Sequence, residues 1–174
     1  MLITHPPQNL RATFIALPGG SAGIRKTTAI MARLVRQWKH DPNLNARAIS
    51  IVQLAPPKDG PREVGALFYF VRDVIRYVND VNGTETLRTP DKTLALKAGD
   101  CDDKTLLLGS MLESIGYQVK FAVAGYNEPD VYEHIYIKTL VPGYGWIALD
   151  PSEKVPPGWE APDPVAYYEQ EIPA

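Results

Sequence analysis

The chain has 174 residues, a net charge of −2 from 18 basic and 20 acidic side chains, and one cysteine. Since domains hold about 100–200 residues, this length indicates one compact domain with terminal arms. The charge balance argues against binding to nucleic acid or to an anionic membrane, which needs a basic surface. A single cysteine excludes an intramolecular disulfide and an all-cysteine metal site.

The chain also lacks the marks of a membrane or secreted protein. No stretch approaches the roughly 20 apolar residues of a membrane span. Residues 1–7 lack the basic region followed by an apolar region that forms a secretory signal. We therefore expect a cytoplasmic protein.

The predicted elements begin after an N-terminal arm over residues 1–20, which contains several prolines and glycines. Ser21 is placed to cap a helix that runs to about Lys39. A second short helix is expected over residues 44–54. The apolar run Ile49–Val52 in that segment leaves a strand open as the alternative.

A long amphipathic helix comes next. Apolar residues from Val64 to Val78 follow helical spacing and form one stripe, and Asn82-Gly83 predicts a turn after it. Thr89-Pro90 opens a helical segment through about Lys97, because proline is tolerated at a first helical position. A leucine-rich helix then begins near Cys101 and ends at Gly116, which stands where a C-terminal glycine is favoured.

Beyond this glycine, the apolar residues no longer repeat about every 3.6 positions, as in a helix, but at every second position, as in a strand. Tyr117–Ala124, Val131–Leu140 and Trp146–Asp150 read as strands. Helices followed by strands predict an α+β fold with an antiparallel sheet. Pro151–Ala174 holds six prolines, too many for a central strand, so we expect it to lie across the surface.

Cys101 is the first candidate for chemistry. A lone cysteine is commonly a small core hydrophobe, but this one stands at the start of a helix, where free N–H groups and the helix dipole stabilise a thiolate. The neighbouring carboxylates have the opposite effect on the thiol pKa. We expect Asp100 to cap the helix and Asp103 to bond free N–H groups in its first turn. Activation of the sulfur would still need a histidine.

Three histidines are available. His5 lies in the arm and His40 ends a charged helix, so both are expected to face solvent. His134 lies in an alternating strand, and Asp150 ends the next one. Two strands joined by a tight turn can bring these side chains together as a base and the residue that orients it. The plainer alternatives are a packed core histidine and a turn aspartate before proline.

The order of these features resembles the transglutaminase-like superfamily. Gly99–Asp103 opens a helix, His134 follows in a strand, and Gly145–Trp146 leads to Leu149–Ser152. The resemblance covers roughly residues 62–152.

This resemblance implies a papain-like core in which N-terminal helices and the cysteine-bearing helix pack on a small antiparallel sheet. Residues 1–60 look like the extra N-terminal helices of small bacterial and phage-encoded members. The division it suggests is a domain over residues 21–152 with a Pro-rich C-terminal arm over residues 153–174.

The resemblance also implies roles. Cys101 would be the nucleophile, His134 the base and Asp150 the orienting group. The Cys101 backbone N–H would be one donor to the oxyanion, and Tyr77 the second. The implied function is a cysteine peptidase or amidase that acts on a protein or peptide. Transglutaminase-type cross-linking is one alternative. Another is an assembly module of a phage particle, virion-associated, with the triad idle or used once and the arms contacting other subunits.

No cofactor and no metal is predicted. The stretch 20–27 imitates a phosphate-binding loop, but Arg25 stands where that loop needs glycine. The acidic residues Asp100, Asp102 and Asp103 could in principle bind calcium, yet they lack the spacing and the glycine of a calcium loop.

Overall fold

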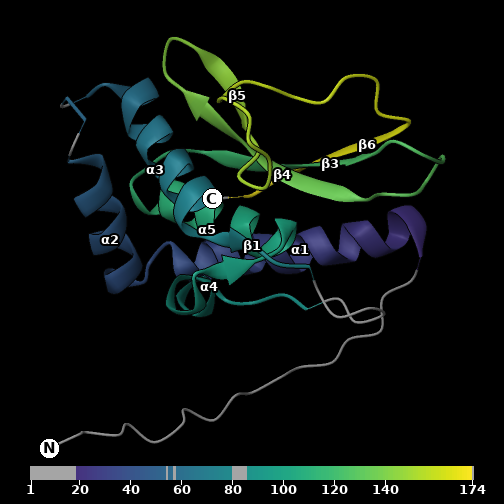
Figure 1. Ribbon diagram of the computed structural model, residues 1–174, viewed down its shortest axis with the longest axis horizontal. Helices are drawn as coiled ribbons and strands as arrows, with labels where there is room; N and C mark the ends of the chain where they lie inside the picture. The colour runs from purple at the N-terminus through teal and green to yellow at the C-terminus, as the bar shows by residue number, and fades with distance from the viewer. Residues whose placement is uncertain (1–18, 54, 57, 80–85, 174) are drawn as a thin grey trace, which may run out of the picture.

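The computed structural model describes residues 19–53, 55–56, 58–79 and 86–173 (Figure 1). Residues 1–18 of the predicted arm, with His5, and the predicted turn at Asn82-Gly83 lie outside these ranges. In chain order, the helices and strands of the described part are α1 (Gly20–Trp38), α2 (Pro42–Val52), α3 (Gly60–Val74), β1 (Arg76–Tyr77), α4 (Pro90–Leu96), β2 (Ala98–Gly99), α5 (Cys101–Ser114), β3 (Val119–Gly125), β4 (His134–Val141), β5 (Gly145–Leu149) and β6 (Ala166–Glu171).

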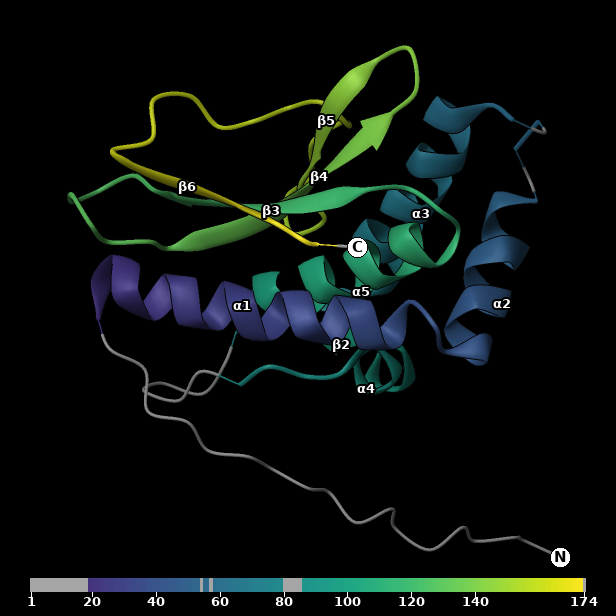
Figure 2. The ribbon, with the colours of Figure 1, turned by 180° about the vertical axis from the view of Figure 1, so that it is seen from behind.

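Four strands form one antiparallel sheet in the order β5-β4-β3-β6. β3 pairs on one side with β4, from Val119 opposite Thr139 to Ala124 opposite His134, and on the other side with β6. Figures 1 and 2 show α1 and α5 lying under one face of this sheet, with α2 and α3 beside one of its ends. The predicted α+β fold with an antiparallel sheet is confirmed.

Helix α5 lies at the centre of the molecule. It contacts α1, α2, α3 and α4 as well as β3 and β4. Residues 103–112 are therefore all buried, because every face of the helix has a neighbour. The leucines of α5 thus serve the protein core. Among the described residues, no helix combines the length and apolarity needed to cross a membrane.

The two faces of the sheet bury different side chains. Large residues such as Phe121 and Ile137 point into the main core with the helices, whereas Ala122, Tyr136 and Ala148 form a small cluster on the other face. The segment after β5 is tied to this second face. The Gly158 N–H donates to the Ala148 carbonyl at 2.7 Å, and the Tyr136 hydroxyl donates to the Glu160 carboxylate at 2.5 Å.

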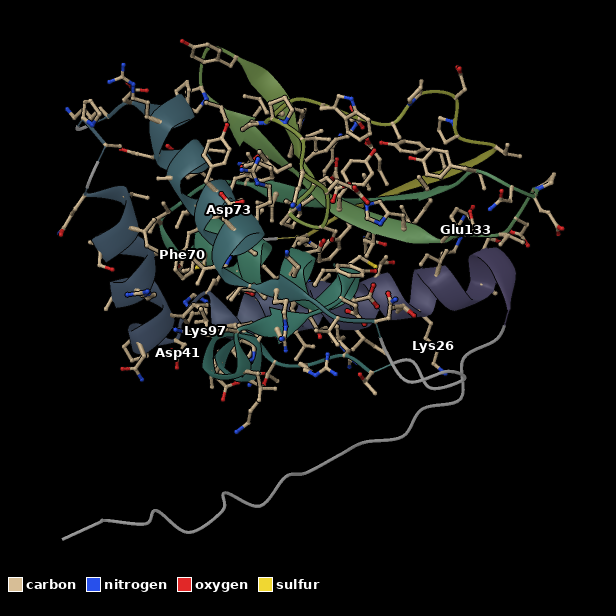
Figure 3. The ribbon with its side chains drawn as sticks, in the orientation of Figure 1. Lys26, Asp41, Phe70, Asp73, Lys97 and Glu133 are labelled. Carbon is tan, nitrogen blue, oxygen red and sulfur yellow. The ribbon has the colours of Figure 1, made fainter. Side chains whose placement is uncertain are left out.

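The first two helices begin differently. The prediction that Ser21 caps α1 is wrong, because α1 already starts at Gly20 and the Ser21 N–H donates to Asp130 of the β3–β4 loop at 2.8 Å. A residue 109 positions away thus does the capping, which no local pattern can indicate. α2 is a helix rather than a strand. Its Asp41 side chain, labelled in Figure 3, accepts the Leu44 N–H at 2.8 Å.

The long amphipathic helix ends earlier than predicted. α3 stops at Val74, although the apolar stripe continues to Val78. The next residues pair in parallel with β2 instead: the Arg76 N–H donates to the Lys97 carbonyl at 2.9 Å, and the Val78 N–H donates to the Gly99 carbonyl at 3.1 Å. Pairing with distant chain therefore overrides helical periodicity here.

The C-terminal segment is only partly the surface arm that was expected. Residues 151–165 contain no helix or strand, but Ala166–Glu171 forms β6 along the edge of the sheet next to β3. No proline falls within β6, since the prolines of this segment stand before and after it. An edge strand agrees with the exclusion of a central strand, and it corrects the expectation that the whole segment lies across the surface.

Candidate active site

The cysteine stands where the sequence predicted, at the first residue of α5. The Asp100 side chain caps the helix by accepting the Asp103 N–H at 3.2 Å, and the Asp100 carbonyl accepts the first helical bond, from the Lys104 N–H at 3.1 Å. Within the described part of the chain, the Cys101 N–H has no acceptor. It is therefore free to bind a negative oxygen at the start of the helix.

His134 and Asp150 meet as predicted. His134 is the first residue of β4, and Asp150 directly follows β5, which pairs with β4 from Leu149 opposite Ile137. The His134 Nε2 lies 2.6 Å from an Asp150 carboxylate oxygen. The other oxygen of Asp150, which is 5% exposed, accepts the Ser152 N–H at 3.0 Å. The carboxylate is thus fixed on both oxygens.

The cysteine helix is attached to the strand that carries the histidine. The Thr105 hydroxyl donates to the Ile135 carbonyl at 3.1 Å, and the Ile135 backbone also hydrogen bonds to the Cys101 sulfur. Because Ile135 follows His134 directly, the sulfur lies beside the first residues of β4. The structure therefore brings Cys101 to the same place as the pair formed by His134 and Asp150.

The surroundings of the sulfur favour the neutral thiol. Burial is the largest cause that raises the pKa of Cys101, and the negative charges of Asp102 and Asp100 raise it further, whereas the hydrogen bond from Ile135 lowers it. The thiol also contacts a carboxylate oxygen of Asp102 at 3.4 Å. The sulfur of the resting protein is therefore protonated at neutral pH and needs a base before it can attack.

His134 is suited to hold a proton. Burial alone would lower its pKa, but the hydrogen bond and the charge of Asp150 outweigh burial, and Glu153 and Asp102 add to them, so the pKa of His134 is raised. An Asp150 carboxylate that accepts from Nε2–H leaves the lone pair of Nδ1 as the site that can take a proton. The His134 ring also stacks on Tyr136, with 6.1 Å between ring centroids.

Tyr77 lies near the sulfur, although not on the predicted helix. It belongs to β1, opposite Gly99 of β2, two residues before Cys101. Burial, followed by the charges of Cys101, Asp100, Asp102 and Glu153, raises the pKa of Tyr77 to about 12. Its hydroxyl, half-exposed, therefore remains a hydrogen-bond donor at physiological pH.

Two charged residues of α5 have roles that sequence reasoning missed. Asp103 is fully buried, and it accepts the Arg88 backbone N–H at 2.7 Å and pairs with the Arg88 guanidinium. Lys104 is 2% exposed, and its ammonium donates to backbone carbonyls at the end of α3. The prediction for Asp103 named only N–H groups in the first turn of the helix, and no local signal indicated its contacts with Arg88, 15 residues earlier in the chain.

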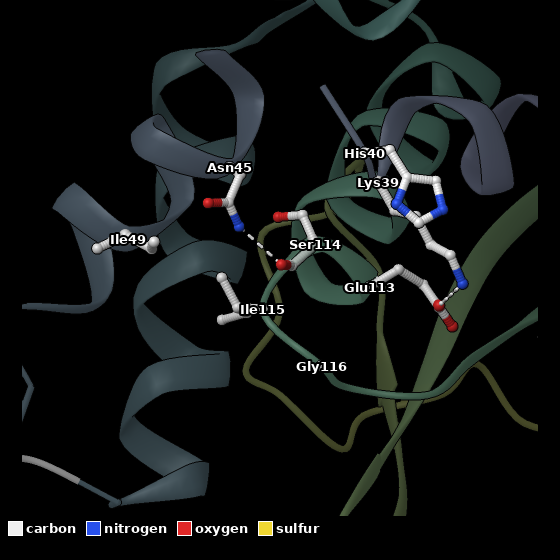
Figure 4. A pocket seen from close by; sticks show the side chains of 8 residues that line it. All are labelled: Lys39, His40, Asn45, Ile49, Glu113, Ser114, Ile115 and Gly116. Atoms are coloured by element: carbon white, nitrogen blue, oxygen red, sulfur yellow. Dashed lines mark hydrogen bonds and ion pairs between the residues drawn. The ribbon is translucent and has the colours of Figure 1, made fainter. Parts of the chain in front are cut away.

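The opposite end of α5 lines a hollow of about 560 Å³ (Figure 4). Its polar groups pair with one another. Lys39 contacts Glu113 at 3.2 Å, and the Asn45 side chain donates to the Ser114 carbonyl at 2.7 Å. His40 lines this hollow and is exposed, as predicted. The Ser114 hydroxyl in this hollow donates to the Met111 carbonyl at 2.8 Å, and in the described part of the chain no carboxylate orients His40, so we place the candidate site at the Cys101 end.

Solved structures share this fold. A candidate protease from Parabacteroides distasonis aligns with a TM-score of 0.53 and 17% identity over 75% of this chain and 27% of its own. A candidate cysteine protease from Cytophaga hutchinsonii aligns with a TM-score of 0.51 and 16% identity over 65% of this chain and 38% of its own. LapG of Legionella pneumophila aligns with a TM-score of 0.52 and 15% identity over 83% of this chain and 87% of its own. The chain thus spans less than two fifths of the first two proteins, and identities this low establish the fold alone.

The sequence itself identifies the family. No curated protein sequence matches the chain. The profile of the transglutaminase-like superfamily, however, matches residues 45–151, more than half of the chain, and this range includes Cys101, His134 and Asp150. The chain therefore belongs to the transglutaminase-like superfamily.

Proposed function

We propose that the protein is a cysteine hydrolase that cleaves amide bonds in a peptide or protein. The observation that carries this proposal is the 2.6 Å contact between His134 Nε2 and Asp150, formed beside a cysteine at a helix N-terminus. A nucleophile, a base and a group that orients the base are the parts needed for acyl transfer through a thioester.

In the first half of the proposed reaction, His134 Nδ1 takes the thiol proton as the Cys101 sulfur attacks the amide carbonyl carbon. The carbonyl oxygen becomes an oxyanion, which the Cys101 N–H and the Tyr77 hydroxyl bind. When the C–N bond breaks, His134 returns its proton to the leaving amine, and a thioester on Cys101 remains. A neutral resting thiol suits this sequence, since proton transfer accompanies attack.

In the second half, water attacks the thioester carbonyl and His134 takes a proton from it. The C–S bond then breaks, the sulfur regains the proton, and a carboxylic acid leaves. An amine in place of water would give a new amide and no net hydrolysis. Both outcomes pass through one acyl-enzyme. We favour water because two solved structures of this fold carry the names of candidate proteases.

The acyl-enzyme can be tested with p-nitrophenyl acetate, which needs no knowledge of the natural substrate. We expect release of p-nitrophenolate together with a mass increase of one acetyl group on Cys101. Both signals should be lost in Cys101→Ser. His134→Ala should slow acylation by about 10³-fold. His40→Ala is the matched control, because His40 is exposed at the far end of α5. Equal acylation of the His134 and His40 variants would overturn the proposal.

The same assay separates hydrolysis from transfer. The acyl-enzyme is formed and then divided between buffer alone and buffer with a primary amine such as glycine methyl ester. A hydrolase releases mainly acetate in both samples. Release of mainly the acetylated amine, at an amine concentration far below that of water, would instead establish the transferase reaction.

A further inference from the structure

Lys104 is a buried cation close to the candidate site. It lies on α5, three residues after Cys101, and is 2% exposed. Its Nζ donates to the Ile75 carbonyl at 2.8 Å and to the Arg72 carbonyl at 3.2 Å. These carbonyls belong to the last turn of α3 and the residue after it, where helix carbonyls lack partners of their own. The lysine thus satisfies the end of α3 from inside the protein.

A charge in this position carries a cost. Burial lowers the pKa of Lys104 to about 8, although the negative charges of Asp150 and Asp73 partly offset this effect, and the positive charge of Arg72 adds to it. An apolar residue would fit the core without that cost, as Leu106–Leu108 do on the same helix. The ammonium is therefore kept where its charge is unfavourable for folding.

The groups that Lys104 holds lead to the other parts of the candidate site. Ile75 directly precedes β1, which carries Tyr77. The Arg72 guanidinium donates to the Val155 carbonyl at 3.0 Å, five residues after Asp150. The junction of α3 and β1 therefore lies between the tyrosine and the segment that follows the aspartate, and Lys104 joins it to the helix of Cys101.

We propose that Lys104 is a positioning residue of the candidate site: its ammonium fixes the α3–β1 junction against the cysteine helix. This inference rests on the proposed function for its effect on rate. The expected effect of the Lys104 charge on the pKa of His134 does not depend on the proposed function. The charge of Asp150 favours the Lys104 ammonium, and Asp150 is hydrogen bonded to His134.

The effect of the Lys104 charge has a defined sign. Around Lys104 the charged groups are Asp150, Asp73 and Arg72, and the first two favour the ammonium. Removing this cation leaves Asp150 with less compensation and takes a positive charge away from the imidazolium. The pKa of His134 should therefore rise in Lys104→Met. In the wild type, a second step in the His134 NMR shifts near pH 8 should mark deprotonation of Lys104.

The experiment compares Lys104→Met with Lys39→Met in the full chain. Lys39 is likewise a paired lysine, with 18% of its side chain exposed, but it lies at the far end of α5. The measurements are the thermal midpoint, the NMR titration of His134 and the rate of acylation by p-nitrophenyl acetate. We expect both variants to lose stability, while only Lys104→Met raises the His134 pKa and slows acylation by about tenfold.

The outcomes separate the two proposals. A loss of stability in Lys104→Met with an unchanged His134 titration and rate would reduce Lys104 to a structural residue, and acylation that still requires His134 would leave the proposed function intact. If Lys104→Met does not fold, the wild-type titration decides. A single step in the pH titration of the His134 NMR shifts would overturn the inference. A second step near pH 8 that disappears in Lys104→Arg would support it.

Discussion

The two ends of α5 show what separates a site from a hollow. At the C-terminal end, the polar groups of the hollow pair with one another: Lys39 with Glu113, and the Asn45 side chain with the Ser114 carbonyl. At the N-terminal end, the strand β4 lies beside the Cys101 sulfur and carries His134, which in turn pairs with Asp150 after β5. Charged side chains and a histidine occur at both ends. Among the described residues, only the N-terminal end combines a cysteine with a partly buried histidine that is held by a carboxylate.

The helix itself adds to this difference. The partial positive charge at a helix N-terminus favours a thiolate or an oxyanion, whereas the C-terminus favours a cation. Cys101 and Lys39 lie at the ends that suit them. The predictions below test this contrast by changing matched residues at the two ends.

The largest effect is expected from Asp150→Asn. The amide oxygen stays with the Ser152 N–H, so the NH2 group faces His134 Nε2 and favours the tautomer that carries the proton on Nδ1. Acylation by p-nitrophenyl acetate should therefore slow by about 10³-fold. Glu113→Gln, the matched change at the far end, should stay within about twofold. A loss below tenfold in Asp150→Asn would remove the functional contrast between the two ends.

Asp103→Ala should have the next largest effect, on stability. This substitution leaves Arg88 and its backbone N–H without the buried carboxylate, and breaking a buried ion pair costs about 3–5 kcal/mol. Urea unfolding measures the change. Glu113→Ala, which breaks the pair with Lys39, should cost less, because the Glu113 side chain keeps 12% of its surface in solvent whereas Asp103 keeps none. An equal loss in the free energy of unfolding for the two variants would mean that the carboxylates at the two ends of α5 stabilise the protein equally.

The order of Cys101, His134 and Asp150 could be predicted from sequence because each lies at the boundary of an element with a local signature. Asp100 precedes an apolar helix, and period-2 strands bracket the histidine and the aspartate. The strands before and after a tight turn must pair in antiparallel fashion, so their ends are near each other.

The parts that escaped prediction depend on contacts between distant residues. Tyr77 leaves the helical pattern because β2 supplies partners for its backbone, and β6 forms because β3, more than 40 residues earlier, has a free edge. Lys104 is buried because the end of α3 needs a donor. A single sequence shows the lysine but not the carbonyls it meets.

Tyr77→Phe tests the group that sequence reasoning placed on the wrong element. Loss of one oxyanion-hole donor costs about 10²–10³-fold in rate. Because Tyr77 is 45% exposed, we expect the lower end of that range, about 10²-fold. Acylation kinetics measure it. Tyr144→Phe, an exposed tyrosine on the β4–β5 turn, should leave the rate unchanged. An unchanged rate in both variants would leave the Cys101 N–H as the oxyanion donor on this chain.

The smallest effect expected is a pH dependence of stability that comes from His134. Its pKa is raised in the folded protein, so the folded state binds the proton more tightly than the unfolded state. This contribution is fully present below the unfolded pKa, about 6.5. It is lost as the pH rises through the folded value, so stability falls with pH in that window.

The comparison of His134→Gln with His40→Gln isolates this contribution, because other groups titrate alike in both variants. We expect the free energy of unfolding of His134→Gln to lie further below the wild type at pH 6 than at pH 9, measured by urea unfolding. His40→Gln should run parallel to the wild type, since His40 is exposed and has no carboxylate partner in the described part of the chain. Parallel curves for both variants would mean that Asp150 does not stabilise the imidazolium, and the electrostatic contrast between the two ends of α5 would be lost.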